Sequence, residues 1–206
     1  MVDSKDKERL LSLYEGRLEK YGYDVKTVGW GSVKDQYSRF DMLLRGVDCN
    51  NKDILDLGCG LGDFIGYLKQ KKIKNFTYTG IDLSDRFIEK AKEKYQESSC
   101  NFFAKNVFND KLPKADIVIV SGMLTFNIKG TKVNIKKIMQ KMFDSANEIL
   151  TINFMSTYVD FELEKNLHFP PEEIFTHAKK ITKWVNIYHD YPLYEFTIQL
   201  KKASIQ

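Results

Sequence analysis

The segment 53–68, DILDLGCGLGDFIGYL, constrains the fold of this chain more than any other part of the sequence. It begins with a short apolar run, continues through Gly58, Gly60 and Gly62, and ends in a run with the apolar spacing of a helix. A strand that leads through a glycine turn into a helix is typical of an open α/β sheet, in which ligands bind at the carboxyl ends of the strands. A turn that only lets the helix pack closely on the sheet would have the same sequence, so the glycines alone do not establish a ligand.

Two acidic residues beside the glycines indicate which kind of ligand the turn could accept. Asp63 falls in the first turn of the expected helix, where its carboxylate would compete with a pyrophosphate for the positive helix end. Asp56 precedes the glycines, and the pattern D-x-G-C-G-x-G-D differs from the G-x-G-x-x-G of dinucleotide sites. We therefore expect the turn to disfavour a dinucleotide and to be compatible with a cationic ligand.

From this segment onward, short apolar runs alternate with helical patterns, which predicts an α/β fold with a mostly parallel sheet. The run 115–120, ADIVIV, is apolar throughout, as expected of a central strand covered on both faces. We expect strands at 53–57, 76–82, 101–104, 115–120 and 148–155, a final hairpin over 183–202, and helices at 62–71, 84–95, 133–146 and 170–180. Two amphipathic helices, over 5–22 and 31–46, precede the sheet, and Ser32 with Asp35 resembles a capping box for the second.

Length and composition limit the class of protein. A chain of 206 residues, 43% hydrophobic and 29% charged, predicts one domain over 1–206, with 1–50 as a helical lid or flank and 51–206 as a Rossmann-like core. No apolar run approaches the roughly 18 residues of a spanning helix, and the N-terminus lacks the apolar stretch of a signal peptide, so we expect a cytoplasmic protein. The net charge of +4 comes from dispersed lysines, which makes a nucleic-acid partner less favoured. The three cysteines lack C-x-x-C spacing, and no cluster has the spacing of metal ligands.

Polar residues that follow other strands should reach the same edge of the sheet as the glycine turn. Asp82 ends the second strand, where its carboxylate could accept both hydroxyl groups of a ribose lying across the first two strands. Leu83 follows it, Asn106 and Val107 follow the third strand, and Ser121 follows the fourth. Together these positions favour a nucleoside ligand.

These motifs resemble those of the class I S-adenosylmethionine-dependent methyltransferases, and the resemblance covers Asp53 to about Gln199. ILDLGCGLGDF is similar to the first motif of that family, GIDLSDRFIEKAK to the second, and ADIVIVSGML to the fourth. The resemblance implies a three-layer fold with a seven-stranded sheet in the order 3-2-1-4-5-7-6, in which strand seven is antiparallel. It also implies a methyltransferase that uses S-adenosyl-L-methionine and releases S-adenosyl-L-homocysteine.

The resemblance also implies roles for individual residues. Asp56, Gly58, Cys59 and Gly60 would approach the methionine part of the cofactor, Asp82 and Leu83 the ribose, and Asn106 and Val107 the adenine, with Ser121 at the same edge. The adenine position often carries Asp in this family. Asn106 stands there in this chain, and its carbonyl oxygen can still accept a hydrogen bond from the adenine amine.

The segment 21–40, YGYDVKTVGWGSVKDQYSRF, resembles the N-terminal helix of small methyltransferases from sugar and surface-polysaccharide gene clusters. A cofactor carboxylate needs a cation, and Arg39 is the candidate, with Gln36 on a similar face of the helix. Arg39 could equally lie on a solvated face. Trp30 could cover the cofactor or anchor the lid against the core.

The acceptor is the least determined part of the function. The chain has Ser121-Gly122-Met123-Leu124 where enzymes that methylate exocyclic amino groups of nucleic acids show [DN]-P-P-[YF], so a small acceptor is favoured. A hydroxyl acceptor needs a general base, whereas an ionised phosphate or carboxylate does not. The candidates for a base are His189, in the connection of the final hairpin, and His168 and Tyr158, in the loop after strand five. His189 could instead be an exposed turn residue.

We therefore expect O-methylation of a small polar acceptor, such as a sugar, a nucleotide-sugar or a phosphorylated or phosphoramidate-type metabolite, in capsule or surface-polysaccharide biosynthesis. The alternatives are an RNA or protein methyltransferase and a non-catalytic partner subunit with the same fold. The protein could be a monomer or a homodimer.

Overall fold

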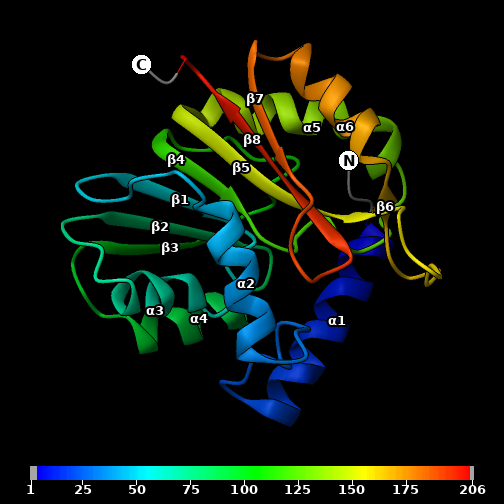
Figure 1. Ribbon diagram of the computed structural model, residues 1–206. Helices are drawn as coiled ribbons and strands as arrows, with labels where there is room; N and C mark the ends of the chain where they lie inside the picture. Colours follow the sequence, from blue (N-terminus) through cyan, green and yellow to red (C-terminus); the bar gives the residue numbers. More distant parts are fainter. Residues whose placement is uncertain (1–3, 205–206) are drawn as a thin grey trace.

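In the computed structural model, residues 4–204 are described, and they form a three-layer α/β fold around one mixed sheet (Figure 1). The strand order is β3-β2-β1-β4-β5-β8-β7, and a short strand, β6, pairs with the end of β5. The strands are β1 (Asp53–Leu57), β2 (Thr77–Asp82), β3 (Cys100–Ala104), β4 (Ala115–Val120), β5 (Ala146–Ser156), β6 (His168–Phe169), β7 (Trp184–Tyr188) and β8 (Glu195–Lys201). Apart from β6, this is the expected order 3-2-1-4-5-7-6.

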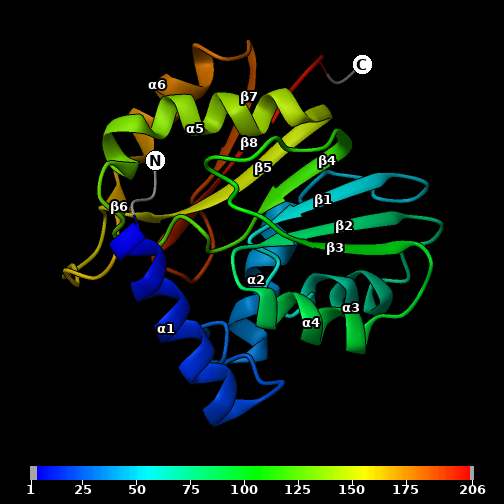
Figure 2. The same cartoon turned by 180° about the vertical axis from the view of Figure 1, so that it is seen from behind.

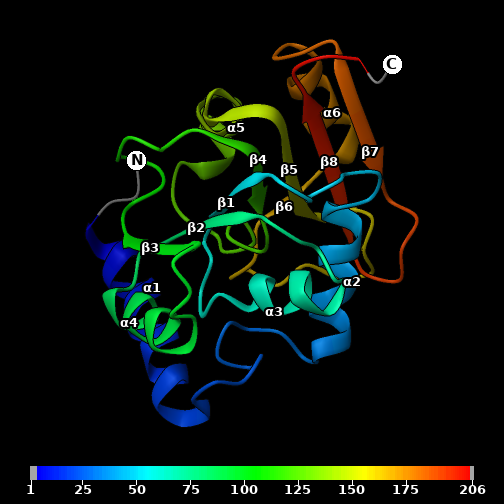
Figure 3. The ribbon, with the colours of Figure 1, turned by 90° about the vertical axis from the view of Figure 1, so that its left-hand side faces the viewer.

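The helices lie on both faces of the sheet and along one of its edges. They are α1 (Ser4–Tyr21), α2 (Val33–Leu43), α3 (Asp63–Gln70), α4 (Asp85–Lys94), α5 (Thr131–Ser145) and α6 (Pro171–Lys179). Figure 3 shows α5 and α6 on one side of the sheet and α2 and α3 on the other. The predicted elements are confirmed, with boundaries that differ by one to three residues in most cases.

The central strands β1 and β4 are apolar on both faces because each face meets a layer of helices. Leu55 and Val118 of these strands pack in the cluster under α5 and α6. Ile54 and Ile117 pack in the opposite cluster, with residues of α2 and α3. In the parallel register Ile54 pairs with Ile117 and Leu55 with Val118, so successive rows of the ladder supply the two cores in turn.

The hairpin of β7 and β8 closes the sheet with one antiparallel strand, as expected. Strand β8 alternates polar and apolar residues, but its polar face is covered by α2 and does not face solvent. The amide nitrogen Nε2 of Gln199 donates to the carbonyl oxygens of Leu43 and Arg45 at 3.2 and 3.0 Å. The hydroxyl of Thr151, on β5, also donates to Leu43 at 3.0 Å. The C-terminal end of α2 is thus held to the sheet by buried hydrogen bonds, which are costly to leave unmade.

Helix α1 lies outside the sheet and starts near β6 in both side views (Figures 1 and 2). Its first turns are held by Arg9, whose Nη2 donates to the carbonyl oxygen of Asn127 at 2.7 Å. Further along, Glu15 accepts a hydrogen bond from the hydroxyl of Ser84 at 2.9 Å. Ser84 is also the N-cap of α4, as the sequence predicted. Helix α1 therefore runs from the loop after β4 to α4, across the carboxyl ends of the strands. Within residues 4–204, no helix is both long and apolar enough to cross a membrane.

Candidate active site

A cavity of about 510 Å³ lies at the carboxyl ends of β1, β2 and β4, beneath α1 and α2. This volume falls within the roughly 300–1,000 Å³ of small-molecule sites. Every residue that the sequence predicted for cofactor binding lines it: Trp30, Gln36, Arg39, Asp56, Gly58, Cys59, Gly60, Asp82, Leu83, Asn106, Val107 and Ser121. The structure thus brings together residues from six separate parts of the chain, while their individual contacts with a cofactor stay predictions.

The glycine turn is tied to the neighbouring strand by backbone hydrogen bonds. The N–H groups of Gly58 and Cys59 donate to the carbonyl oxygen of Ile81 at 2.8 and 3.1 Å. Gly58 has φ +80, a conformation that L side chains rarely adopt. A Cβ atom on Gly58 would also lie 2.8 Å from the side chain of Met123, which follows β4. Glycine is needed here for both backbone conformation and close approach.

Asp82 holds the other side of the same turn. Its Oδ2 accepts from the N–H of Gly60 at 3.0 Å, and its Oδ1 accepts from the N–H of Ser84 at 3.1 Å. Burial raises the pKa of Asp82, and hydrogen bonds from backbone N–H groups oppose that rise. Each carboxylate oxygen makes one of these bonds and keeps capacity for another acceptor contact. Asp82 can therefore accept hydroxyl groups of a ligand in the cavity without losing its structural bonds.

Asp56 lies deeper, beneath the turn. The hydroxyl of Tyr78 donates to Asp56 Oδ2 at 2.6 Å, and both residues are buried. Burial raises the pKa of Asp56 to about 7, the hydrogen bond from Tyr78 lowers it, and the nearby charge of Asp82 raises it further. A cationic group in the cavity would favour the ionised form of this buried carboxyl group.

The start of α3 is held by α2 and α4 through one carboxylate. Gln36 Nε2 donates to Asp63 Oδ2 at 3.1 Å, and Lys94 Nζ donates to Asp63 Oδ1 at 3.0 Å. Asp63 lies in the first helical turn, as predicted. Its negative charge occupies the helix end where a phosphate would bind, which agrees with the expectation that a dinucleotide is disfavoured.

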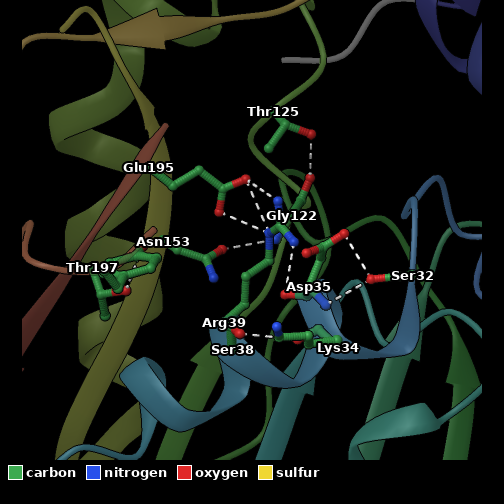
Figure 4. A network of polar contacts seen from close by, with 11 residues as sticks. Ser32, Lys34, Asp35, Ser38, Arg39, Gly122, Thr125, Asn153, Glu195 and Thr197 are labelled. Atoms are coloured by element: carbon green, nitrogen blue, oxygen red, sulfur yellow. Dashed lines mark hydrogen bonds and ion pairs between the residues drawn. The ribbon is translucent and has the colours of Figure 1, made fainter. Parts of the chain in front are cut away.

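Arg39 contacts a residue that the sequence analysis did not identify. Its Nε donates to both carboxylate oxygens of Glu195 at 3.0 and 2.9 Å, and its Nη2 donates to Oε1 at 2.7 Å (Figure 4). The third nitrogen, Nη1, donates to the carbonyl oxygen of Asp35 at 2.9 Å. Arg39 is therefore not on a solvated helix face. Its side chain is buried, pairs with Glu195 and forms part of the cavity wall. One signal in the sequence could have identified Glu195. It is the first residue of a strand, and it follows a loop at the edge of the sheet where the cavity lies.

Trp30 closes the cavity beside the end of β4. The guanidinium carbon of Arg39 lies 4.0 Å from the centroid of the Trp30 ring. The indole ring also packs against Gly122, where an added Cβ atom would lie 2.5 Å from the ring. Gly122 is itself fixed, because its N–H donates to Asn153 Oδ1 at 3.0 Å and its carbonyl oxygen accepts from the Thr125 hydroxyl at 2.7 Å (Figure 4). Trp30 thus both lines the cavity and anchors the N-terminal segment, so the two alternatives for it are compatible.

The far wall contains Asn106 and Ser121. Asn106 Oδ1 accepts from the N–H of Phe108 at 3.0 Å, which fixes the side chain in a local turn. Ser121 Oγ is buried and has no hydrogen-bond partner within residues 4–204. A buried hydroxyl without a partner is unfavourable unless a ligand or water completes it. This orphaned group, together with the carboxylate of Asp82, fits a polar nucleoside ligand.

The three predicted catalytic residues, His189, His168 and Tyr158, are not among the residues that line the cavity, and their catalytic role stays a prediction. His168 is buried with Nδ1 2.7 Å from the carbonyl oxygen of Ser156, to which Nδ1 must donate. Tyr158 is exposed, and its ring contacts that of His189 at 5.9 Å. Asp190 does not orient His189, because its carboxylate pairs with Arg45 at 2.7 Å. The hairpin connection does reach the cofactor edge, but it presents Leu193 to the cavity.

At the end opposite the residues predicted to bind the nucleoside, both apolar and polar side chains line the cavity. Met155, Leu163 and Leu193 supply apolar surface, and Lys165, Asn166 and Glu195 supply polar groups. Lys165 has no ion pair with any residue of the described range. Over residues 4–204, no group of three or more His, Cys, Asp or Glu side chains could hold a metal ion.

Comparisons with known proteins agree with this architecture. A family model described as a methyltransferase domain matches residues 54–148. Rv1506c of Mycobacterium tuberculosis, named as a methyltransferase, is 29% identical over 158 residues, which cover 73% of this chain and 93% of that protein. Malonyl-acyl-carrier-protein O-methyltransferase of Acetivibrio thermocellus is 29% identical over 196 residues, which cover 89% of this chain and 65% of that protein. This chain therefore spans less than two thirds of the second relative. Magnesium protoporphyrin IX methyltransferase from Synechocystis PCC 6803, solved with bound SAH, shares the fold with a TM-score of 0.70 at 13% identity, covering 96% of this chain and 98% of that one.

Proposed function

Since this chain is an S-adenosylmethionine-dependent methyltransferase of class I, we propose that it methylates an oxygen atom of a small polar acceptor. The observation that carries this proposal is the cavity of about 510 Å³ beneath α1 and α2, which holds the cofactor residues at one end and a mixed polar and apolar lining at the other. We propose a sugar, a nucleotide-sugar or a phosphorylated or phosphoramidate-type metabolite as the acceptor, and a role in capsule or surface-polysaccharide biosynthesis.

The residues present fit the cofactor. Asp82 would hold the ribose hydroxyls, Asn106 and Val107 the adenine, and the turn at Gly58 the amino-acid part. The cofactor supplies a methyl group that its sulfonium has already activated. Asp56 and Asp63 make the region around the turn acidic, which suits a ligand with positive charge.

The acceptor end supports a small molecule over a polymer. Helix α1 crosses the carboxyl edge of the sheet, because it is held by Asn127 at one end and by Ser84 further along. The cavity beneath it also receives apolar side chains from α1, among them Leu10 and Tyr14. A covered cavity can exclude water and align one small acceptor, and alignment alone can contribute roughly 7–11 kcal/mol to a reaction barrier.

Lys165 supports an acceptor that carries negative charge. Lys165 lines the cavity and forms no ion pair with any described residue, and the neighbouring Asn166 also lines the cavity. A phosphate or carboxylate of the acceptor would satisfy both. The similarity to an O-methyltransferase of an acyl-carrier-protein substrate also favours an oxygen atom as the methylated position.

Two measurements test this function. Calorimetry should show binding of S-adenosylmethionine and S-adenosylhomocysteine and none of NAD. A panel of sugars, nucleotide-sugars and phosphorylated metabolites is then incubated with methyl-labelled cofactor, and label should enter at least one small molecule. Label that enters only RNA or protein would contradict the acceptor class. A folded protein that binds neither cofactor form would indicate a non-catalytic subunit.

A further inference from the structure

The side chain of Arg39 retains hydrogen-bonding capacity on one edge only. A guanidinium carries five N–H donors. Glu195 takes the donor on Nε and one on Nη2, and Asp35 takes one on Nη1. Two donors therefore remain, one on each terminal nitrogen. Two such donors form a fork that matches a carboxylate.

The orientation of this fork is fixed from several sides. Glu195 accepts from the side edge of the guanidinium, and its own side chain is only 6% exposed. The face of the guanidinium lies 4.0 Å from the Trp30 ring centroid. Glu195 belongs to β8 and Arg39 to α2, so this contact joins elements that are 156 residues apart in the chain. A buried charge pair of this kind cannot be broken on one side without leaving an uncompensated charge.

The position of Arg39 relates its fork to the glycine turn. Gln36 lies one turn earlier on α2 and contacts Asp63, the first residue after that turn. Both Gln36 and Arg39 line the cavity. Arg39 and the glycine turn therefore line the same cavity, in the part assigned to the amino-acid portion of the cofactor. That assignment rests on the proposed function.

We propose that Glu195 is a positioning residue for the cofactor. It holds the guanidinium of Arg39 so that the two remaining N–H donors meet the carboxylate of the cofactor's amino-acid part. Glu195 acts through Arg39 and not by contact with the cofactor. In this arrangement one guanidinium binds two carboxylates, one from β8 and one from the ligand.

The test compares two ligands that share the nucleoside thioether, one with the amino-acid part of the cofactor and one without it. S-adenosylhomocysteine carries the amino-acid carboxylate, whereas 5′-methylthioadenosine has the same nucleoside thioether without it. In the Glu195→Gln variant we expect S-adenosylhomocysteine to bind about tenfold more weakly, the scale of one hydrogen bond to a charged group. The affinity for 5′-methylthioadenosine should change by less than about twofold, which also shows that the variant retains a folded cavity.

Matched variants separate positioning from general loosening of α2. Asp190→Asn removes another Arg–carboxylate pair between the end of α2 and the β7–β8 hairpin, Arg45 with Asp190, outside the cavity. It should leave the ratio of the two affinities unchanged. Glu195→Asp keeps the charge and should lose less selectivity than Glu195→Gln. In an Arg39→Met background, Glu195→Gln should have no further effect on the ratio.

The results that overturn the proposal are distinct from those that overturn the function. If S-adenosylhomocysteine binds the parent protein but Glu195→Gln weakens both ligands equally, Glu195 is only structural. If Glu195→Gln tightens S-adenosylhomocysteine, Glu195 competes with the ligand for Arg39 and does not position it. If the parent protein binds neither ligand, the cofactor assignment fails and the proposal fails with it.

Discussion

The hydroxyl of Tyr78 donates to the carboxylate of Asp56 at 2.6 Å, with both side chains buried beneath the glycine turn. Tyr78 lies on β2 and Asp56 on β1, in adjacent strands. Within residues 4–204, the carboxylate of Asp56 accepts no other hydrogen bond, which is little for a buried acid. Burial raises the pKa of Asp56 to about 7, so its carboxyl group gains or loses a proton near neutral pH.

Stability should fall as pH rises from about 4 to 7 on account of Asp56. Burial raises its pKa in the folded state to about 7, against 3.8 for a free aspartate, so the folded state binds more protons over that interval. The group contributes at most about 1.4 kcal/mol per pH unit to the decline. Urea unfolding at several pH values should show a shallower slope for Asp56→Asn than for the parent protein.

The Tyr78→Phe variant checks the cause of that dependence. The hydrogen bond from Tyr78 lowers the pKa of Asp56, so its removal should move the end of the decline to higher pH. Parallel curves for Asp56→Asn and the parent protein would exclude Asp56 as the titrating group.

Asp82→Ala should weaken binding of S-adenosylhomocysteine by about 1.5–3 kcal/mol, the scale of hydrogen bonds to a charged group. Because Asp82 also accepts from Gly60 and Ser84, the variant should lose thermal stability as well. Asp82→Asn keeps one acceptor oxygen and serves as the control, with a smaller loss expected in calorimetry. Normal binding by Asp82→Ala would show that the ribose lies elsewhere.

Gly122→Ala should displace Trp30 from the wall of the cavity. The new Cβ atom would lie 2.5 Å from the indole, and Gly122 has φ +72. In a Trp184→Phe background Trp30 is the one tryptophan left, so its fluorescence should shift and cofactor affinity should fall. Gly16→Ala, in α1, is the control: no atom lies within 4 Å of its Cβ position, and it should stabilise the protein by roughly 0.5–1 kcal/mol. An unchanged Trp30 spectrum in Gly122→Ala would refute the contact.

His189→Ala should leave methyl transfer and S-adenosylhomocysteine binding within about twofold of the parent, as expected for an exposed residue outside the cavity. His168→Ala should lower the free energy of unfolding by roughly 1–3 kcal/mol, because it removes the buried bond to Ser156. Neither change should lower the rate of methyl transfer to a true acceptor per folded molecule. A large loss of rate in His189→Ala, with stability intact, would restore it as a candidate base.

The resemblance to class I methyltransferases implied the order of the strands in the sheet. The patterns of the sequence itself predicted the helices, the strands and the residues that line the cofactor end of the cavity. Those features follow from local patterns: the apolar run of β4, the glycines around 58 to 62, and the serine cap at Ser84. Strands that are parallel must end at the same edge, so Asp82, Asn106 and Ser121 could be placed together without knowing any distance.

The tertiary structure decided which side chains turn into the cavity and which charges are paired. Strand β8 alternates polar and apolar residues, yet α2 covers its polar face, and Gln199 and Glu195 are buried. Arg39 and Glu195 meet across 156 residues, and no local pattern encodes such a contact. The connection of the final hairpin lies at the cofactor edge of the sheet. Its Asp190 pairs with Arg45 outside the cavity, and Leu193 lines the cavity instead. Local pattern determines which segments become helices and strands, because each element depends on its own residues. The orientation of a side chain in a loop, and the partner of a buried charge, depend on what packs against it from distant parts of the chain.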